Sequence, residues 1–465
     1  MTQPLRLLSA KPKIVPPLDP DFRPISTGNR VYEKAVYASK EKMPLAIALE
    51  RNEGRVSTWR GEIFAPGSGF DADTHVYVER LVKFLLWQKG GWRLVIGGPR
   101  EVAGHVQKVY SSGGARAFDV RLMADVYEKS FVVEQTDFDK APTARESAVA
   151  LGGHLEGCRI GFDLGASDYK LAAVKDGEAV FTMELPWDPK IESDPDFHYR
   201  KISEGLKLAA RHLPQVDAIG GSSAGIYIDN KVMVASLFRA VPKEVFERKV
   251  KPMFLNLRKE WGVPLEVAND GDVTALAGAL SLKQNSVLGI AMGSSQAAGF
   301  LDAGGRITGW LNELAFAPVD YNPRAPTDEW SGDDGCGAQY FSQQAVVRLA
   351  PAAGIELPKE HPAEQLKFVQ ELHRNGDARA VKIFETIGVY LGYALAHYAD
   401  RYDFKHVLIL GRVTSGAGGD IILRGAGEVL KMEFPDIEEK IKLHLPDEKS
   451  KRVGQAVAAA SLPIL

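Results

Sequence analysis

A short bend of small and polar residues follows an apolar stretch and has the composition of a phosphate-binding turn. It reads Asp163-Leu164-Gly165-Ala166-Ser167. Gly165 lets backbone N–H groups approach an anion, Ser167 adds a hydroxyl, and Asp163 adds a carboxylate suited to a hydrated metal ion. A ligand-free β-turn rich in small residues has the same composition. The bend alone therefore leaves both interpretations open.

Further clusters of small and polar residues follow apolar segments later in the chain. They are Gly221 to Gly225, Asn269 to Asp272, Gly293 to Gly299, and Arg412 to Gly419. Small residues directly after a buried strand leave room for a ligand, or for close packing between elements. An earlier corner, Gly97-Gly98-Pro99, precedes a predicted helix and is either a small anion site or turn chemistry.

The elements that must position these clusters are strands that alternate with helices. Ile160, Phe162 and Leu164 alternate with small or polar residues, as in a strand with one buried face, and Lys175 to Glu178 is a hairpin turn. The second half of the chain repeats this order of strand, bend, hairpin and helix. We therefore predict an α/β fold.

Length and composition indicate a multidomain globular protein. A chain of 465 residues exceeds the usual size of one hydrophobic core. We predict an extended, proline-rich arm over residues 1–40, an α/β domain of unknown role over residues 41–150, and two further domains over residues 151–283 and 284–465. The helix near the C-terminus, from Gly454, is rich in small residues and is expected to pack tightly.

The charge and the termini restrict the expected partners and location. The net charge is −3 and the pI is near 6.4, which argues against nucleic acid or an anionic membrane as the main partner. Only Cys158 and Cys336 are present, so a disulfide framework is excluded. The first residues lack the apolar run of a signal peptide, and no stretch approaches 18 apolar residues. We expect a cytoplasmic protein without membrane association.

Taken together and in order, the clusters resemble the motifs of the ROK family (repressor, open reading frame, kinase) of the actin-like ATPase and sugar-kinase superfamily. Residues 159–465, about two thirds of the chain, fit this pattern. The matching motifs are a first phosphate hairpin at Asp163 to Lys170, a sugar-side strand end at Gly221 to Gly225, Asn269-Asp270, a second phosphate loop at Gly293 to Gly299, and an adenosine motif at Leu408 to Gly419.

The resemblance implies two duplicated lobes of the actin-like (ribonuclease H-like) fold, with a central cleft and the extra N-terminal α/β domain. Residues 151–283 and 284–465 are then the first and second lobes. Asp270 is implied as the general base that takes the proton of the attacking hydroxyl. The implied sugar ligands are Asn269, Glu313, Gly225 and Ser223. The implied nucleotide ligands are Asp163, Gly165, Ser167, Lys170, Gly293, Ser294, Ser295, Gly411 and Arg412, with Asp163 also holding Mg²⁺ through water.

Two other interpretations of the Asn269-Asp270-Gly271-Asp272 segment stay open. Asp270 at the start of a helix is also a suitable N-cap, in which case its carboxylate only accepts backbone N–H bonds. Asp272 is the second candidate for the base.

The chain departs from the family pattern where the family has a zinc site. The family's G-E-x-G-H motif corresponds to Asn312-Glu313-Leu314-Ala315-Phe316, so Phe316 replaces the histidine ligand. In the following segment, Glu329 to Cys336, a single cysteine remains where the family has three. One soft ligand cannot form a tetrahedral site, so we predict no structural zinc.

Other departures affect the substrate and the nucleotide. Gly337-Ala338-Gln339 lacks the family's usual sugar-binding glutamate, which argues against glucose as the assumed substrate. Ser295 to Ala298 stand where glycines are typical, and these side chains could crowd a nucleotide. Arg412 interrupts a glycine pair and is available to stack on adenine or to contact a phosphate.

These motifs favour an ATP- and Mg²⁺-dependent kinase of a sugar or sugar derivative. The altered second loop and the lost sugar ligands favour an alternative, a non-catalytic protein that senses a sugar or nucleotide. A DNA-binding repressor is a third possibility, but the N-terminal region has no basic recognition helix. A homodimer is expected from the resemblance.

Overall fold

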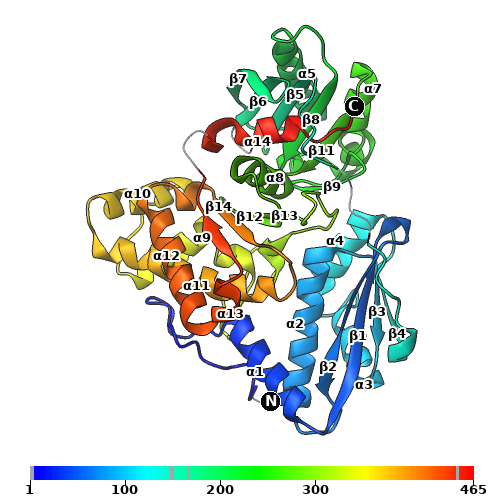
Figure 1. The fold of residues 1–465 in the computed structure, drawn as a ribbon, viewed down its shortest axis with the longest axis vertical. Helices are drawn as coiled ribbons and strands as arrows, with labels where there is room; N and C mark the ends of the chain where they lie inside the picture. Colours follow the sequence, from blue (N-terminus) through cyan, green and yellow to red (C-terminus); the bar gives the residue numbers. More distant parts are fainter. Residues whose placement is uncertain (1–4, 147–150, 166–167, 447–449) are drawn as a thin grey trace.

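The computed structural model describes residues 5–146, 151–165, 168–446 and 450–465, and the chain forms three parts built on separate sheets. Figure 1 shows the N-terminal domain in blue and cyan, the first lobe in green with the red C-terminal helix across it, and the second lobe in yellow and orange. None of the described helices combines the length and the apolar character that a bilayer span requires.

The N-terminal domain is a four-stranded sheet in the order β2-β1-β3-β4 with helices packed against it. β1 is antiparallel to β2 and β3, and β3 is parallel to β4. The strands are β1 (Lys42–Glu50), β2 (Val56–Phe64), β3 (Arg93–Gly97) and β4 (Val132–Thr136), and the helices are α1 (Ile25–Ala38), α2 (Asp71–Lys89), α3 (Arg100–Val109) and α4 (Ala117–Tyr127).

The expected extended arm over residues 1–40 is wrong for its second half, which forms helix α1. The proline-rich segment ends at Pro24, whose extended backbone precedes the helix. The helix buries Ile25, Tyr32 and Val36 on one side. The preceding segment is tied to α2, because the backbone N–H of Leu8 donates to Asp73 Oδ1 at 3.1 Å.

The first lobe is a five-stranded sheet in the order β11-β8-β5-β6-β7, in which β5, β8 and β11 are parallel and β5, β6 and β7 form an antiparallel meander. A separate hairpin, β9 with β10, lies beyond β8. The strands are β5 (Cys158–Leu164), β6 (Asp168–Lys175), β7 (Glu178–Pro186), β8 (Ala218–Ser223), β9 (Ile226–Ile228), β10 (Lys231–Val234) and β11 (Leu265–Asn269). The helices are α5 (Pro195–Ala210), α6 (Lys243–Val245), a π-turn (Phe246–Val250) and α7 (Met253–Trp261).

The second lobe is a four-stranded sheet in the order β13-β12-β14-β15, and helix α8 connects it to the first lobe. β12 is antiparallel to β13 and parallel to β14, which is parallel to β15. The elements are α8 (Asp270–Leu282), β12 (Val287–Met292), β13 (Gln296–Leu301), α9 (Gln343–Ala352), α10 (Pro362–Arg374), α11 (Ala378–Ala399), β14 (His406–Leu410), α12 (Ala417–Glu433), α13 (Pro435–Glu438) and β15 (Lys442–His444).

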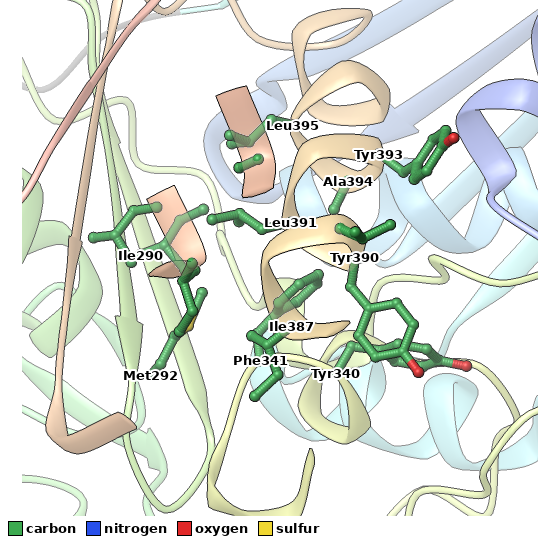
Figure 2. Packing of buried hydrophobic residues seen from close by; sticks show 14 of the residues in the cluster. Ile290, Met292, Tyr340, Phe341, Ile387, Tyr390, Leu391, Tyr393, Ala394 and Leu395 are labelled. Carbon is green, nitrogen blue, oxygen red and sulfur yellow. The ribbon is translucent and has the colours of Figure 1, made fainter. Parts of the chain in front are cut away.

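Helix α11 forms the centre of the second-lobe core. Ile387, Leu391 and Leu395 recur at intervals of four residues and share one side of the helix. Figure 2 shows Leu391 pointing toward Ile290 of β12, while Tyr390 and Tyr393 lie on the other side of the helix. This packing holds β12, and therefore the loop that follows it, against a rigid helix.

The C-terminal helix α14 (Ser450–Ala460), which we expected within the second lobe, packs on the first-lobe sheet. Its backbone approaches the sheet so closely that a Cβ at Gly161 would lie 1.8 Å from the carbonyl oxygen of Ala456, and one at Gly220 would lie 1.7 Å from that of Ala459. The expected tight packing of this small-residue helix is confirmed. The two lobes and the additional N-terminal domain also confirm the predicted α/β fold class.

Candidate active site

Three parallel strands of the first lobe end side by side and present the predicted residues at one edge of the sheet. In the strand register, Asp163 lies opposite Ser222, and Ser223 lies between Leu164 and Asn269. Because the carboxyl ends of neighbouring parallel strands meet at one edge, residues far apart in the sequence are brought together there.

Asn269, the last residue of β11, is the N-cap of helix α8. Its Oδ1 accepts a hydrogen bond of 2.7 Å from the Gly271 N–H, and its Nδ2 donates to the Gly225 carbonyl at 2.7 Å. The capping role that the sequence left open for Asp270 therefore belongs to Asn269. Gly271 is required between the two acids, since a Cβ there would lie 2.1 Å from the carbonyl oxygen of Ala298 in β13.

A cavity of about 450 Å³ brings Asp270 together with residues of the second lobe. This volume lies within the usual range of about 300–1,000 Å³ for small-molecule sites. Seven of the residues predicted for the site line it: Gly225, Asn269, Asp270, Gly293, Ser294, Ser295 and Glu313. Ser223 is buried behind them, and its Oγ accepts a hydrogen bond of 2.6 Å from the Tyr227 hydroxyl.

Two of the acids that line this cavity, Asp270 and Glu313, have strongly perturbed ionisation. Burial, reinforced by the nearby Asp163 charge, raises the pKa of Asp270 to about 6. Burial and the charges of Asp270 and Asp272 raise the pKa of Glu313 to about 8. Perturbed carboxyl groups that share a cavity are typical of catalytic and binding sites.

Glu313 is positioned by the N-terminal domain. Its backbone N–H donates to the Trp87 carbonyl at 3.0 Å, and the N–H of Asn312 donates to the Gln88 carbonyl at 3.0 Å. Both carbonyls belong to the last turn of α2, where they have no partner within the helix. Helix α2 therefore uses its unpaired end to hold the segment that carries Glu313.

Asp272, the second candidate for the base, faces away from this cavity. It lines a different cavity, of about 380 Å³, between the N-terminal domain and the two lobes. Its Oδ1 accepts a hydrogen bond of 3.0 Å from Asn312 Nδ2, and burial raises its pKa to about 7. Its position makes Asp272 a structural partner of Asn312.

Asp163 lies in β5, on the first strand of the hairpin that is predicted to bind phosphate. The Ser222 hydroxyl donates to Asp163 Oδ1 at 2.7 Å, and Lys170 Nζ lies 3.8 Å from its Oδ2. Burial raises the pKa of Asp163. The Gly165 N–H closes the bend by donating to the Asp168 carbonyl at 2.9 Å. Ser167 lies outside the described residues.

A single buried carboxylate such as Asp163 is compatible with Mg²⁺, which keeps several waters and takes most of its other protein-side contacts from substrate phosphates. Within the described ranges, no group of three or more His, Cys, Asp or Glu residues is arranged to hold a metal ion.

The predicted second phosphate loop and the predicted adenosine motif lie at the same edge of the second-lobe sheet. Gly293 follows β12 and Gly411 follows β14, and these strands are parallel neighbours. Gly411 has φ 105°, and a Cβ there would lie 2.4 Å from the carbonyl oxygen of Met292. Arg412 is exposed and does not line the cavity.

Gln296 occupies a position where we expected a side chain to crowd the nucleotide. Gln296 is buried, and a Cβ at Gly337 would lie 2.2 Å from the Gln296 Oε1 atom. The longer side chain is therefore directed into the floor of the cavity, and Gly337 provides the space.

Two further regions line the cavity without a signal in the sequence. Leu122 comes from α4 of the N-terminal domain, and Lys190 comes from the loop after β7 (Glu178–Pro186). Burial, with a smaller effect of Arg239, lowers the pKa of Lys190. Leu122 resembles any apolar residue on a helix, and Lys190 lies in a loop between prolines, so no local pattern marks either.

The segment that departs from the family's zinc motif packs against the N-terminal domain. Phe316 lies against the ring of Trp87, with 4.3 Å between the ring centroids. Cys336 is fully buried, and burial raises the pKa of its thiol to about 12. Between them, Glu329 and Trp330 line the cavity.

Comparison with known proteins places this geometry in context. No family model matches the chain. A glucokinase of Halalkalibacterium halodurans is 25% identical over 288 residues, which cover 57% of this chain and 82% of that protein.

Solved structures share the fold. A ROK family glucokinase from Streptomyces griseus in complex with glucose and AMPPNP has a TM-score of 0.51 and 20% identity, over 66% of this chain and 99% of its own. A ROK family transcriptional regulator, a homologue of the Escherichia coli Mlc protein, has a TM-score of 0.54 and 20% identity, over 66% of this chain and 79% of its own. The chain therefore resembles the ROK-type sugar kinases in sequence and has their actin-like ATPase fold, with an additional N-terminal α/β domain.

Proposed function

We propose that the protein is an ATP-dependent kinase that phosphorylates a hydroxyl of a sugar or sugar derivative. The observation that carries this proposal is one cavity lined by the Asp270 and Glu313 carboxyl groups and by the Ser294-Ser295 loop. The carboxyl groups suit a polyhydroxylated acceptor, and the small-residue loop suits a phosphate. The similarity to a glucokinase and to a glucokinase structure that holds glucose and AMPPNP supports the same reaction class.

Asp270 is the proposed general base. Its carboxylate takes the proton of the acceptor hydroxyl while the hydroxyl oxygen bonds to the γ-phosphorus of ATP. The bond between that phosphorus and the oxygen of ADP breaks, and Asp270 later returns the proton to solvent. With a pKa of about 6, Asp270 is ionised at neutral pH and still basic enough to accept a proton.

The sugar ligands differ in the hydrogen bonds that they can make. Glu313, with a pKa of about 8, is mostly protonated at neutral pH, so it can donate to one sugar oxygen and accept from another hydroxyl. Asn269 uses one N–H and one lone pair in the structure and keeps one of each for a sugar. Gly225 and Ser223 shape the end of β8, next to Asn269.

The nucleotide is proposed to lie between the first hairpin and the two second-lobe loops. The hairpin contributes Gly165, Ser167 and Lys170, and the loops contribute Gly293 to Ser295, Gly411 and Arg412. Mg²⁺ held by Asp163 would neutralise charge on the phosphate oxygens. Lys170 lies 3.8 Å from Asp163 and is close enough to share this role.

A non-catalytic sensor of a sugar or nucleotide is the second candidate. Its support is the likeness of the fold to that of a ROK transcriptional regulator. The two candidates predict the same ligands and differ in turnover alone. A homodimer stays a prediction for either.

The experiment is ADP release with Mg·ATP across hexoses, amino sugars, pentoses and polyols, with melting temperatures measured in parallel. Turnover with one sugar class supports the kinase. Ligands that raise the melting temperature without ADP release by folded protein would reject the kinase and favour the sensor.

A further inference from the structure

The cavity that contains Asp270 has two chemically different sides. Its polar side comes from the lobes and includes Asn269, Asp270 and the Ser294-Ser295 loop. Its apolar side includes Leu122, Ile226, Ala315, Phe316 and Ala338. All five belong to one hydrophobic cluster, which joins the core of the N-terminal domain to residues of both lobes. The additional domain therefore extends its core to the wall of the cavity.

Trp330 is the one large, exposed aromatic side chain among the described residues that line this cavity. It is 58% exposed, whereas Phe316 beside it is 6% exposed. The Trp330 ring meets Phe316 edge-on at 5.3 Å and Phe118 of α4 edge-on at 5.7 Å. A tryptophan that leaves this much apolar surface in water beside a small-molecule cavity points to a ligand that covers it.

Buried ion pairs attach the loop that carries Trp330 to the N-terminal domain. Asp333 accepts a hydrogen bond of 2.5 Å from Lys83 Nζ and a second from the Arg116 guanidinium. Lys83 also lies 3.1 Å from Asp119, and all four side chains are at least nine-tenths buried. Trp330 is therefore exposed but held on an anchored loop, which lowers the cost of ordering it around a ligand.

An unsubstituted sugar would make few favourable contacts with the apolar side of the cavity. Hydroxyl groups placed against Leu122, Phe316 and Ala315 would lose water without gaining hydrogen bonds, which is unfavourable. An apolar group on the sugar would instead bury both itself and the exposed face of Trp330.

We propose that the apolar side of the cavity is a subsite for an apolar substituent of the sugar, with Trp330 and Leu122 as its specificity-determining residues. This inference rests on the proposed function and narrows the substrate to sugar derivatives that carry an aryl group. The N-terminal domain thereby has a function, which is to contribute Leu122 to the acceptor site and to support the Phe316 and Trp330 side of it.

The test is binding, measured by calorimetry with matched pairs of probes. The pairs are methyl and phenyl glycosides of glucose, mannose and galactose in both anomers, and N-acetyl and N-benzoyl glucosamine. In at least one pair, the wild-type protein should bind the aryl member about tenfold more tightly. Maltose and cellobiose test whether a second sugar ring covers Trp330 instead.

Two variants test whether the preference for the aryl probe arises at Trp330 and Leu122. Trp330→Ala should abolish the tenfold advantage of the aryl probe and leave the affinity for its methyl or acetyl partner unchanged. Leu122→Phe should selectively lower the affinity for the aryl probe, because the larger ring narrows the apolar subsite. Met432→Ala, at a 64% exposed position on α12, is the control for loss of an exposed apolar side chain. Melting temperatures establish that each variant is folded.

The inference would be overturned if both members of every pair bound with equal affinity, or if the preference survived Trp330→Ala. It would also be overturned if a disaccharide bound more tightly than the aryl probes. ADP release with the same probes separates this result from the proposed function. Turnover without an aryl preference retains the kinase and rejects the subsite. An aryl preference without turnover retains the subsite and rejects the kinase.

Discussion

The Asn269 side chain caps the helix that Asp270 begins. Asn269 Oδ1 lies 2.7 Å from the Gly271 nitrogen that donates to it, and Asp270 lines the cavity between the lobes. Since Asn269 occupies the capping position, the Asp270 carboxylate can face an acceptor hydroxyl. Two adjacent residues with similar side chains therefore have different tasks, which are set by their backbone positions.

The pH dependence of turnover should follow the ionisation of Asp270. A general base works only when ionised, and the pKa of Asp270 is raised to about 6 by burial and by Asp163. We expect kcat/KM to be half-maximal near pH 6 and to fall about tenfold for each pH unit below it. The residual rate of Asp270→Asn should lack this acid limb, whereas titration of the nucleotide would leave the limb in both proteins. A flat profile between pH 5 and pH 8 would contradict the assignment.

Gly271 should not tolerate a larger residue. A Cβ at this position would lie 2.1 Å from the Ala298 carbonyl oxygen, so Gly271→Ala must displace the start of α8 or β13. We expect a loss of about 1–3 kcal/mol in the free energy of unfolding and a larger fall in kcat, because Asp270 moves with the helix. Urea unfolding and steady-state kinetics measure the two effects.

Gly427 is the matched control for that substitution. It lies in α12, where a Cβ would meet nothing within 4 Å. Gly427→Ala should be neutral or stabilising by about 0.5–1 kcal/mol. If Gly271→Ala behaves in the same way, the close approach of α8 and β13 has no importance for the site.

The buried ion pairs beneath the Trp330 loop should be important for stability. Lys83 is fully buried between Asp119 and Asp333, so Lys83→Met leaves both carboxylates with less countercharge. We expect a loss of about 3–5 kcal/mol in the free energy of unfolding, measured with urea. The exposed pair between Lys140 and Asp137 is the comparison, and Lys140→Met should hardly move the urea midpoint. A Lys83→Met variant as stable as the wild type would contradict this role of the network.

We predict that the purified protein contains far less than one zinc ion per chain. The resemblance places Phe316 where the family has a histidine ligand, and Phe316 packs on Trp87 at 4.3 Å. The remaining Cys336 is a buried thiol whose pKa is raised to about 12. A cysteine binds zinc as a thiolate, and burial disfavours the thiolate of Cys336. Elemental analysis measures the metal, and a chelator should leave the melting temperature unchanged. Stoichiometric zinc, or a large fall in melting temperature with chelator, would show the prediction to be wrong.

Much of the fold and part of the site can be predicted because their signals are local. An apolar strand that ends in small or polar residues marks the strand ends at Asp163, Ser223 and Asn269 without knowledge of the tertiary structure. The parallel order of these strands then places them at one edge. The same local signal marks Gly293 and Gly411 in the second lobe.

The remaining site residues depend on how the domains pack, which no local period encodes. Trp87 and Gln88 hold the Glu313 segment through backbone carbonyls at the end of a helix, so their side-chain types carry no information about this task. Leu122 lines the cavity only because α4 packs against Phe316. The C-terminal helix is likewise recognisable as a tightly packing helix, but its partner, the first-lobe sheet, is far away in sequence.

The most direct test compares Asp270→Asn with Asp272→Asn in ADP release from Mg·ATP and the best acceptor sugar. The two acids are two residues apart and both have raised pKa values, but only Asp270 lines the cavity with the phosphate loop. We predict that Asp270→Asn lowers kcat about 10²–10⁴-fold with little change in sugar affinity, and that Asp272→Asn retains most of the activity. Full activity of Asp270→Asn, or a larger loss in Asp272→Asn, would contradict the assignment of Asp270 as the base.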